Sequence, residues 1–276
     1  MGLFFSLLAA LFWGTGDFCG GLAARKRDQY LVLAVSAFSG ALVLALAALI
    51  GREPFPHGWG LLWSILAGLG GAAGIASLYR GLSIGNSAVV APTSAVIGAA
   101  LPVGVTLLLH GAPQTIQLIG FGVALVGIVL VSTSIAHGDS SDRRGFALGV
   151  IAGIGFALYF IFIAQAGEGL VFTPLVLART CMLLAALALV GVRRLPLPRL
   201  QTMPVALLAG VFDATGNVFF LLAKTSSRLD FAVILSSIYP AITVLWTALF
   251  LKEKLNWLQK LGLVVCLVAI LLITAQ

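Results

Sequence analysis

The sequence predicts an all-α integral membrane protein whose ten transmembrane helices form two inverted repeats of five helices. Three observations support this fold class: an apolar composition, ten apolar segments of spanning length, and weak similarity between the two halves. Hydrophobic residues make up 61% of the 276-residue chain and charged residues 9%, whereas a soluble domain carries about 25% charged residues. So few charges cannot cover a water-facing surface, and most of the outside must therefore face lipid.

The net charge of +7 does not indicate a nucleic-acid-binding protein. The basic residues stand in short runs between apolar segments, such as Arg25-Lys26-Arg27 and Arg193-Arg194, and not on one solvated face. Cys19, Cys181 and Cys266 lie in apolar stretches without metal-ligand spacing. We therefore expect a lipid bilayer and a small-molecule substrate as partners, with no nucleic acid, metal or cofactor.

A helix needs about 20 apolar residues to cross the hydrocarbon core of a bilayer. The first candidate span lacks a basic leading region and a clear cleavage site, so we expect a retained helix and not a signal peptide. No connection between spans is long enough to form a separate domain. The ten predicted spans are 3–22, 30–50, 59–79, 87–109, 115–136, 146–166, 173–191, 203–223, 230–251 and 256–275.

The positions of Lys and Arg predict how the chain is oriented. If the spans alternate in direction, most basic residues fall in one set of loops, and the other set, with both termini, holds only Arg52, Lys224 and Arg228. The positive-inside rule then places both termini outside the cytoplasm. We therefore expect a multi-pass protein of the inner or plasma membrane that is a monomer or a homodimer.

The halves 1–138 and 143–276 are weakly similar in the same block order. The matched blocks are Ala88-Val89-Val90 with Ala232-Val233-Ile234, and Gln117 and Gly120 with Gln259 and Gly262. Because five is odd, the second half enters the membrane upside down relative to the first. Inverted repeats of this kind are a recurring plan of secondary transporters, with a site near the midplane. We therefore expect a cavity lined by helices one, three, four, six, eight and nine that opens alternately to either side.

Prolines and glycines add two expectations about the helices. Pro92, Pro102 and Pro240 should bend the fourth and ninth spans. The pairs Gly16 with Gly20 and Gly70 with Gly74 have the four-residue spacing that lets helix backbones approach closely in lipid.

Two acidic residues, Asp17 and Asp213, lie well inside predicted spans. A charge at the bilayer centre costs roughly 2.5–3.5 kcal/mol on insertion scales, so such residues normally face a cavity or a partner. Each is a candidate proton or cation site, and Asn217 lies one turn after Asp213 on the same face. The alternative is a structural hydrogen bond or an ion pair with Arg80 or Arg179. Arg179 in turn could pair with Asp213 or bind a substrate carboxylate.

Aromatic and hydroxyl side chains complete the candidate site. Trp13, Tyr79, Tyr159 and Tyr239 could line the cavity with aromatic faces, which suit cations or flat solutes. Thr93 and Ser94, next to Pro92 in the fourth span, and Ser237, before Pro240 in the ninth, hold nearly equivalent places in the two halves. The full candidate set is Trp13, Asp17, Tyr79, Thr93, Ser94, Tyr159, Asp213, Asn217, Ser237 and Tyr239, with Arg80 and Arg179 as ion-pair candidates.

Three blocks carry a resemblance to a known family. They are Leu11-Phe12-Trp13-Gly14-Thr15-Gly16-Asp17-Phe18, Tyr79-Arg80-Gly81-Leu82, and Ser236-Ser237-Ile238-Tyr239-Pro240 through Leu251-Lys252-Glu253-Lys254-Leu255. In them the chain resembles the drug/metabolite transporter superfamily, in particular its ten-helix EamA branch. The resemblance implies export of amino acids, metabolites or drug-like molecules, usually without ATP. It also implies cytoplasmic termini, against the charge count, and both orientations stay open.

Two rival classes remain. Gly14-Thr15-Gly16-Asp17 matches the Gly-x-Gly-Asp string of intramembrane aspartyl proteases, with Asp213 as a possible second acid. In those proteases, however, the other aspartate precedes the string, and the Pro-Ala-Leu signature is missing here. A non-transporting scaffold or channel is the other alternative. We expect a transporter and not an enzyme.

Overall fold

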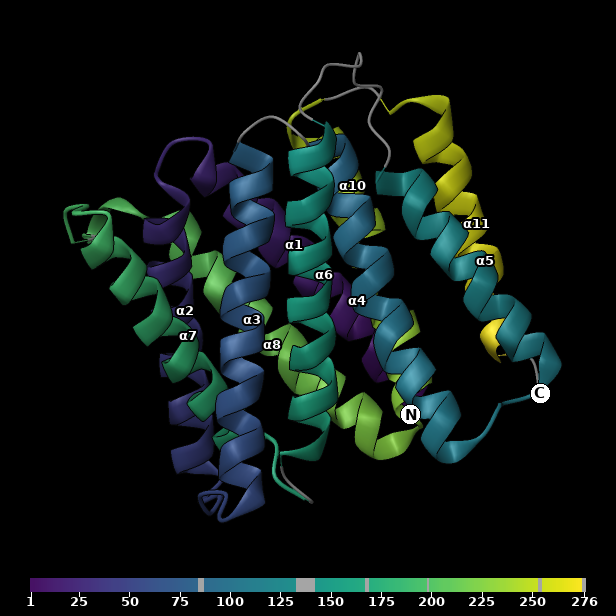
Figure 1. Cartoon of the computed structure of the whole chain (residues 1–276), viewed down its shortest axis with the longest axis horizontal. Coiled ribbons are helices and arrows are strands. Elements are labelled where there is room, and N and C mark those ends of the chain that lie inside the picture. The colour runs from purple at the N-terminus through teal and green to yellow at the C-terminus, as the bar shows by residue number, and fades with distance from the viewer. Residues whose placement is uncertain (84–86, 133–141, 167–168, 198, 253–254, 275–276) are drawn as a thin grey trace.

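The computed structural model describes residues 1–83, 87–132, 142–166, 169–197, 199–252 and 255–274, and their regular elements are helices (Figure 1). The helices are α1 (Gly2–Ala24), α2 (Gln29–Ile50), α3 (Trp59–Ser83), α4 (Ser87–His110), α5 (Thr115–Ser132), α6 (Asp142–Gln165), α7 (Phe172–Val192), the 3-10 turn η1 (Leu200–Thr202), α8 (Pro204–Ser226), α9 (Leu229–Ser236), α10 (Tyr239–Phe250) and α11 (Trp257–Thr274). The predicted boundary between the two halves, at 138–143, falls mostly outside the described residues.

Eight segments of the described helices are long and apolar enough to cross a membrane. They lie in α1, α2, α3, α4, α6, α7, α8 and the α9–α10 segment, while the apolar parts of α5 and α11, Thr115–Leu130 and Trp257–Ile273, are shorter. The chain is therefore a multi-pass membrane protein. The total of ten spans stays a prediction, because it depends on α5 and α11.

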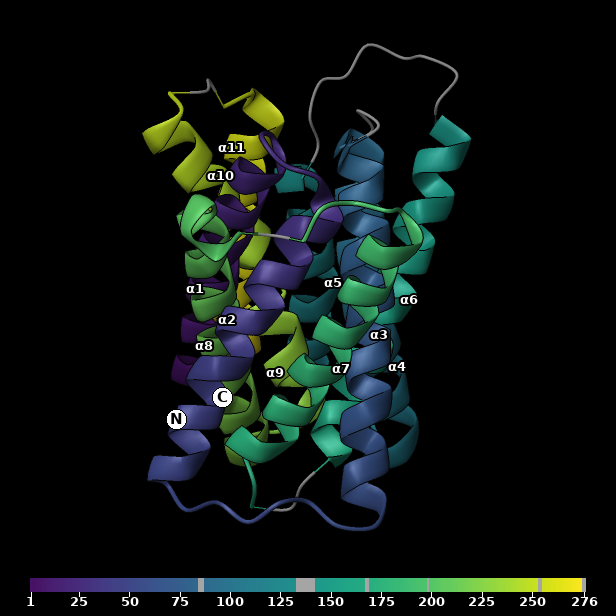
Figure 2. The same ribbon diagram turned by 90° about the vertical axis from the view of Figure 1, so that its left-hand side faces the viewer.

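Successive long helices run in opposite directions, and both chain termini lie toward the same end of the bundle (Figures 1 and 2). We call this the termini end; it also holds the α2–α3, α4–α5, α6–α7 and α8–α9 connections. Pairs of helices that are distant in sequence pack against each other: α1 on α8, α3 on α6, α2 on α7, and α5 on α11. Further packing joins α2 to α8, α3 to α7, α4 to α6, and α9 and α10 to α1.

Small residues bring these helices into backbone contact. A Cβ atom built on Gly155 of α6 would lie 2.6 Å from the backbone nitrogen of Gly74 in α3. A Cβ on Gly70 would lie 3.0 Å from the Gly155 carbonyl oxygen, and one on Gly16 would lie 3.2 Å from the Asp213 nitrogen. The expected close approach of helix backbones is confirmed at Gly16, Gly70 and Gly74, whereas Gly20 lies against the side chain of Tyr79. In lipid, such packing replaces the hydrophobic drive that holds soluble helices together.

The predicted ninth span is broken into α9 and α10 at Ser237 and Ile238. Pro240 explains the break, because a proline has no N–H to donate and disfavours helical backbone in the residue before it. By contrast, α4 is continuous over Ser87–His110 and contains Pro92 and Pro102. The bend expected in the ninth span is therefore a full interruption of the helix.

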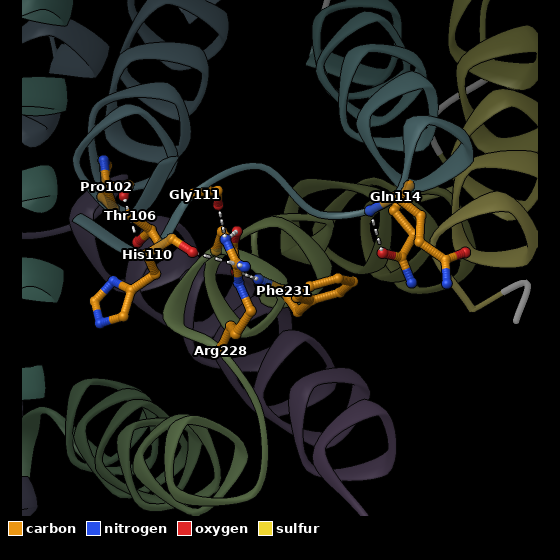
Figure 3. A network of polar contacts seen from close by, with 9 residues as sticks. Pro102, Thr106, His110, Gly111, Gln114, Arg228 and Phe231 are labelled. Carbon is orange, nitrogen blue, oxygen red and sulfur yellow. Dashed lines mark hydrogen bonds and ion pairs between the residues drawn. The ribbon is translucent and has the colours of Figure 1, made fainter. Parts of the chain in front are cut away.

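A polar cluster at the termini end joins α4 to α9 (Figure 3). The guanidinium of Arg228 pairs with the fully buried carboxylate of Asp230 at 2.9 Å. The same group donates hydrogen bonds to the carbonyl oxygens of Gly111, at 2.6 Å, and His110, at 3.5 Å. These carbonyls belong to the last residue of α4 and to the residue after it, where a helix lacks its own donors. Arg228 therefore ties the end of α4 to the start of α9.

A second tie at the termini end involves Glu53, in the connection after α2. Its carboxylate accepts hydrogen bonds from the backbone N–H groups of Val171, at 2.5 Å, and Thr173, at 2.6 Å. A carboxylate here also complements the positive end of the α7 dipole. Each of the two ties connects a segment from the first half of the chain with one from the second.

Candidate solute-binding cavity

A cavity lies among helices from both halves of the chain. Its walls come from α1, α3, α4, α6, α7, α8, the α9–α10 junction, and Ser36 of α2. The space open to the centre of a water molecule is about 90 Å³, and a single bound water needs about 10–15 Å³. The cavity therefore has room for several waters or a small solute. Helix α7 and Ser36 are additions to the lining expected from the sequence.

Four of the candidate residues from the first half line this cavity: Trp13, Asp17, Tyr79 and Ser94. The hydroxyl of Tyr79 reaches from α3 to α1, because a Cβ on Gly20 would lie 2.7 Å from that oxygen. Gly20 follows Asp17 by about one turn of α1. The missing side chain at Gly20 thus lets the Tyr79 hydroxyl lie against α1 near Asp17.

Five candidates from the second half line the same cavity: Tyr159, Asp213, Asn217, Ser237 and Tyr239. Asn217 accepts a hydrogen bond of 3.1 Å from the indole nitrogen of Trp13, and the two side chains are 3% and 6% exposed. This bond joins α8 to α1 across the chain. It satisfies one polar atom on each buried side chain, as buried polar groups require.

Arg179 of α7 forms an ion pair with Asp213 of α8, and both side chains line the cavity. The Arg179 side chain is 4% exposed and the Asp213 side chain 29%. The guanidinium also contacts the sulfur of Met182 at 3.6 Å. Of the two roles considered for Arg179, pairing with Asp213 is the one present in this structure. A guanidinium so deeply buried needs such a counter-charge.

Asp17 differs from Asp213 in its surroundings. Among the described residues, its carboxylate forms no hydrogen bond or ion pair. The hydroxyl groups of Tyr159 and Ser237, whose residues are 8% and 2% exposed, likewise make no side-chain hydrogen bond within the described part of the chain. Buried polar groups in folded proteins are normally hydrogen-bonded to protein or water. The cavity thus presents polar groups whose bonding capacity is unused.

An aromatic cluster borders the cavity beside Trp13. The ring centres of Trp13, Phe160 and Phe220 lie 5.1–5.6 Å from one another, within the range of favourable aromatic pairs. Tyr239 meets the Trp13 ring edge-on at 6.2 Å. No pattern in the sequence singles out Phe160 or Phe220, because a phenylalanine in an apolar span looks the same whether it faces lipid or the interior.

Two candidate residues lie away from the cavity lining. Thr93 packs against α6, where a Cβ on Gly149 would lie 2.8 Å from the Thr93 Cβ. Arg80 stands in the last turn of α3. Neither is among the lining residues, although their neighbours Ser94 and Tyr79 are. A shift of one residue turns a helical side chain by about 100°, which accounts for the position of Thr93, while the ion-pair role of Arg80 stays a prediction.

These features match a known family of membrane proteins. A family model described as the EamA-like transporter family matches residues 1–133 and 143–275. The chain belongs to the EamA-like transporter family. The resemblance seen in the sequence is confirmed, and membership places this EamA-like protein among membrane transporters of small solutes.

Two further comparisons are consistent with this assignment. An uncharacterized protein of Methanocaldococcus jannaschii is 34% identical over 74 residues, which are 27% of this chain and 54% of the relative. The match thus spans about half the length of that relative. A protein of known crystal structure has a TM-score of 0.77 at 17% identity, over 99% of this chain and 98% of the other. At that identity, the similarity shows a shared fold for the EamA-like chain and nothing about its solute.

Proposed function

We propose that this EamA-like protein is a secondary transporter that moves a small solute by alternating access through the central cavity. The observation that carries this proposal is the cavity itself, which is enclosed by helices from both halves and lined with charged, hydroxyl and aromatic side chains. Transporter sites near the membrane midplane are commonly built at such an interface. The cavity would hold the solute while one end of the bundle closes and the other opens.

Two inverted halves of five spans would supply the two gates. We propose α1–α5 as the first half and α6–α11 as the second, with α9 and α10 forming one span. The two matched segments of the family model, 1–133 and 143–275, are of similar length. Exchanging corresponding helices also preserves the packing pattern: α1 on α8 becomes α6 on α3, α2 on α8 becomes α7 on α3, and α4 on α6 becomes α9 and α10 on α1.

The described contacts fit a state in which the termini end is closed. The Arg228 and Glu53 ties both join the two halves at that end. Opening this end would break them, and closing the opposite end would compensate with other contacts. Alternating access requires two such packings of similar free energy. We further propose a location in the inner or plasma membrane, as a monomer or homodimer.

Asp17 is the candidate for coupling transport to protons or cations. Its carboxylate lines the cavity without a cationic partner among the described residues. An unpaired carboxylate in such a place favours binding of a proton or of a cation from solution. Asp213 is a weaker candidate, because Arg179 already neutralises it. The same ion pair disfavours the protease alternative, in which the two acids would share one proton.

Purified protein in proteoliposomes tests the proposal. Solute uptake should proceed without ATP and should respond to a proton gradient or to solute loaded on the other side. Asp17→Asn should abolish the response to the proton gradient, whereas Asp28→Asn, at the N-cap of α2 and outside the cavity, should keep it. Flux through Asp17→Asn with unchanged dependence on the gradient would contradict the coupling role. Solute flux that shows neither counter-transport nor gradient dependence would contradict alternating access, and cleavage of a membrane peptide would favour the protease.

A further inference from the structure

The fixed charges of the cavity do not cancel. Arg179 contributes one positive charge, and Asp213 and Asp17 contribute one negative charge each. The Arg179–Asp213 pair neutralises itself, which leaves the Asp17 carboxylate as the uncompensated charge among the described lining residues. A buried charge without a partner is costly, and it is stabilised by an opposite charge that fills the site.

The cavity also offers hydrogen-bonding and aromatic groups. Tyr79, whose hydroxyl lies against α1 about one turn from Asp17, lines it together with Tyr239. The hydroxyl groups of Tyr159 and Ser237 also make no side-chain hydrogen bond among the described residues. Aromatic faces attract cations. Acceptor oxygens around a carboxylate favour a cation that still carries N–H donors, since each N–H can donate a hydrogen bond.

Much of the remaining wall is apolar, although Ser36, Ser94 and Asn217 also line it. Ile75, Leu78, Ala95 and Met182 line the cavity together with Phe156 and Phe160. Such a surface favours the uncharged part of a solute, because burying apolar area removes it from water. The lining therefore matches a solute with one polar cationic end and one apolar or aromatic body.

We propose that the cavity selects a protonated primary amine of net charge +1 with an apolar or aromatic body, held by the Asp17 carboxylate. With a zwitterion bound, the net charge of the filled site would stay at −1, and with an anion bound it would be −2. A quaternary ammonium ion carries the same charge as the amine but has no N–H to donate. This inference rests on the proposed function and names the chemical class of its solute.

Four probes that share one ring separate these classes: tyramine, its N,N,N-trimethyl derivative, tyrosine and 4-hydroxyphenylacetate. Binding to the purified protein is measured by isothermal titration calorimetry at pH 7. Tyramine should bind at least about ten-fold more tightly than each of the others, since a hydrogen bond to a charged group is worth about that factor or more. Equal or tighter binding of tyrosine, the anion or the trimethyl derivative would overturn the proposal, as would the failure of all four to bind.

Variants test the role of Asp17 in this selectivity. Asp17→Asn keeps the side-chain shape and removes the charge, so tyramine should lose about ten-fold or more in affinity. Asp28→Asn is the matched control: Asp28 accepts a hydrogen bond of 2.8 Å from Tyr30 at the start of α2 and lies outside the cavity. Asparagine is also a good N-cap, so tyramine affinity should be unchanged. Melting temperatures of both variants, measured without ligand, confirm that they are folded. A folded Asp17→Asn protein with wild-type tyramine affinity would overturn the proposal.

The two proposals fail in different ways. If tyramine binds with the expected selectivity but does not cross the bilayer in proteoliposomes, the amine site stands and the transport proposal falls. If another solute shows counter-transport while tyramine neither binds nor crosses, the transport proposal stands and the amine site falls.

Discussion

The guanidinium of Arg179 is held inside the bundle by one carboxylate. Its side chain is 4% exposed, and the ion pair with Asp213 joins α7 to α8. Removing one partner of a buried pair leaves an uncompensated charge, which costs more than the pair contributes when intact. The pair is thus a local requirement for stability as well as part of the cavity wall.

We predict that Asp213→Asn lowers the free energy of unfolding by about 3–5 kcal/mol, because it leaves Arg179 without its counter-charge. Asp213→Asn combined with Arg179→Met should regain most of this loss, since the double variant has no buried charge to compensate. Denaturant titration of the detergent-solubilised variants gives both values. Equal stability of Asp213→Asn and the wild type would show that solvent or another group compensates Arg179.

At the residue scale, the sequence predicted polar cavity residues better than apolar ones. Asp17 and Asp213 were recognisable because a charge within an apolar span needs a special environment. Phe160 and Phe220 were not recognisable, because burial in protein and burial in lipid favour the same side chain. Thr93 lies one helical position from the lining residue Ser94, a difference that no pattern in the sequence resolves.

Among the helices, α2 and α8 approach each other through a glycine. A Cβ atom on Gly210 of α8 would meet the carbonyl oxygen of Ser36 and the hydroxyl of Ser39 in α2. The Ser39 hydroxyl also donates a hydrogen bond of 2.8 Å to the Leu207 carbonyl oxygen. The backbone of α2 therefore occupies the place where a side chain of α8 would stand.

We predict that Gly210→Ala destabilises the protein by about 1–3 kcal/mol, as expected for overpacking of a close contact. The matched control is Gly122→Ala in α5, where a Cβ atom would have no neighbour within 4 Å. That variant should be neutral or stabilising by up to about 1 kcal/mol, because alanine favours the helix more than glycine does. Equal melting temperatures of the two variants would contradict this account of the α2–α8 contact.

At the element scale, the sequence predicted where helices lie and not which of them meet. The lengths of the apolar stretches predict where the spans lie, and Pro240 predicts a bend in the ninth span. The hydrogen bonds that Glu53 accepts at the start of α7 could not be predicted from the sequence. They join residues more than a hundred positions apart, and a lone glutamate in a short loop has the pattern of an ordinary solvated residue.

Across the whole molecule, the Arg228 and Glu53 ties both lie at the termini end of the bundle. Residue Asn86 holds the place in the first half that Asp230 holds in the second, so the Arg228–Asp230 charge pair has no charged counterpart in the internal repeat. If the halves exchange roles during transport, the tie contributes to only one of the two closed ends.

We predict that Arg228→Gln increases hydrogen exchange in the last turn of α4 and the first turn of α9. The variant loses the donors to Gly111 and His110 and the counter-charge of the buried Asp230. Regions with fewer contacts open more often and exchange faster. Arg199→Gln, at the opposite end of the bundle, is the control and should exchange as the wild type does. Unchanged exchange in Arg228→Gln would show that the cluster does not hold these helices together.

The interruption between α9 and α10 gives the second half a joint that the first half lacks. The twelve-residue α10 is connected to α9 by two residues and packs on α1, where the Thr243 hydroxyl donates to the Gly14 carbonyl oxygen at 3.1 Å. The short helix α10 can change its angle while α9 stays in place, whereas the continuous helix α4 has to tilt as a single unit. In the proposed transport cycle, the second half can therefore move α10 alone, where the first half has to move the whole of α4.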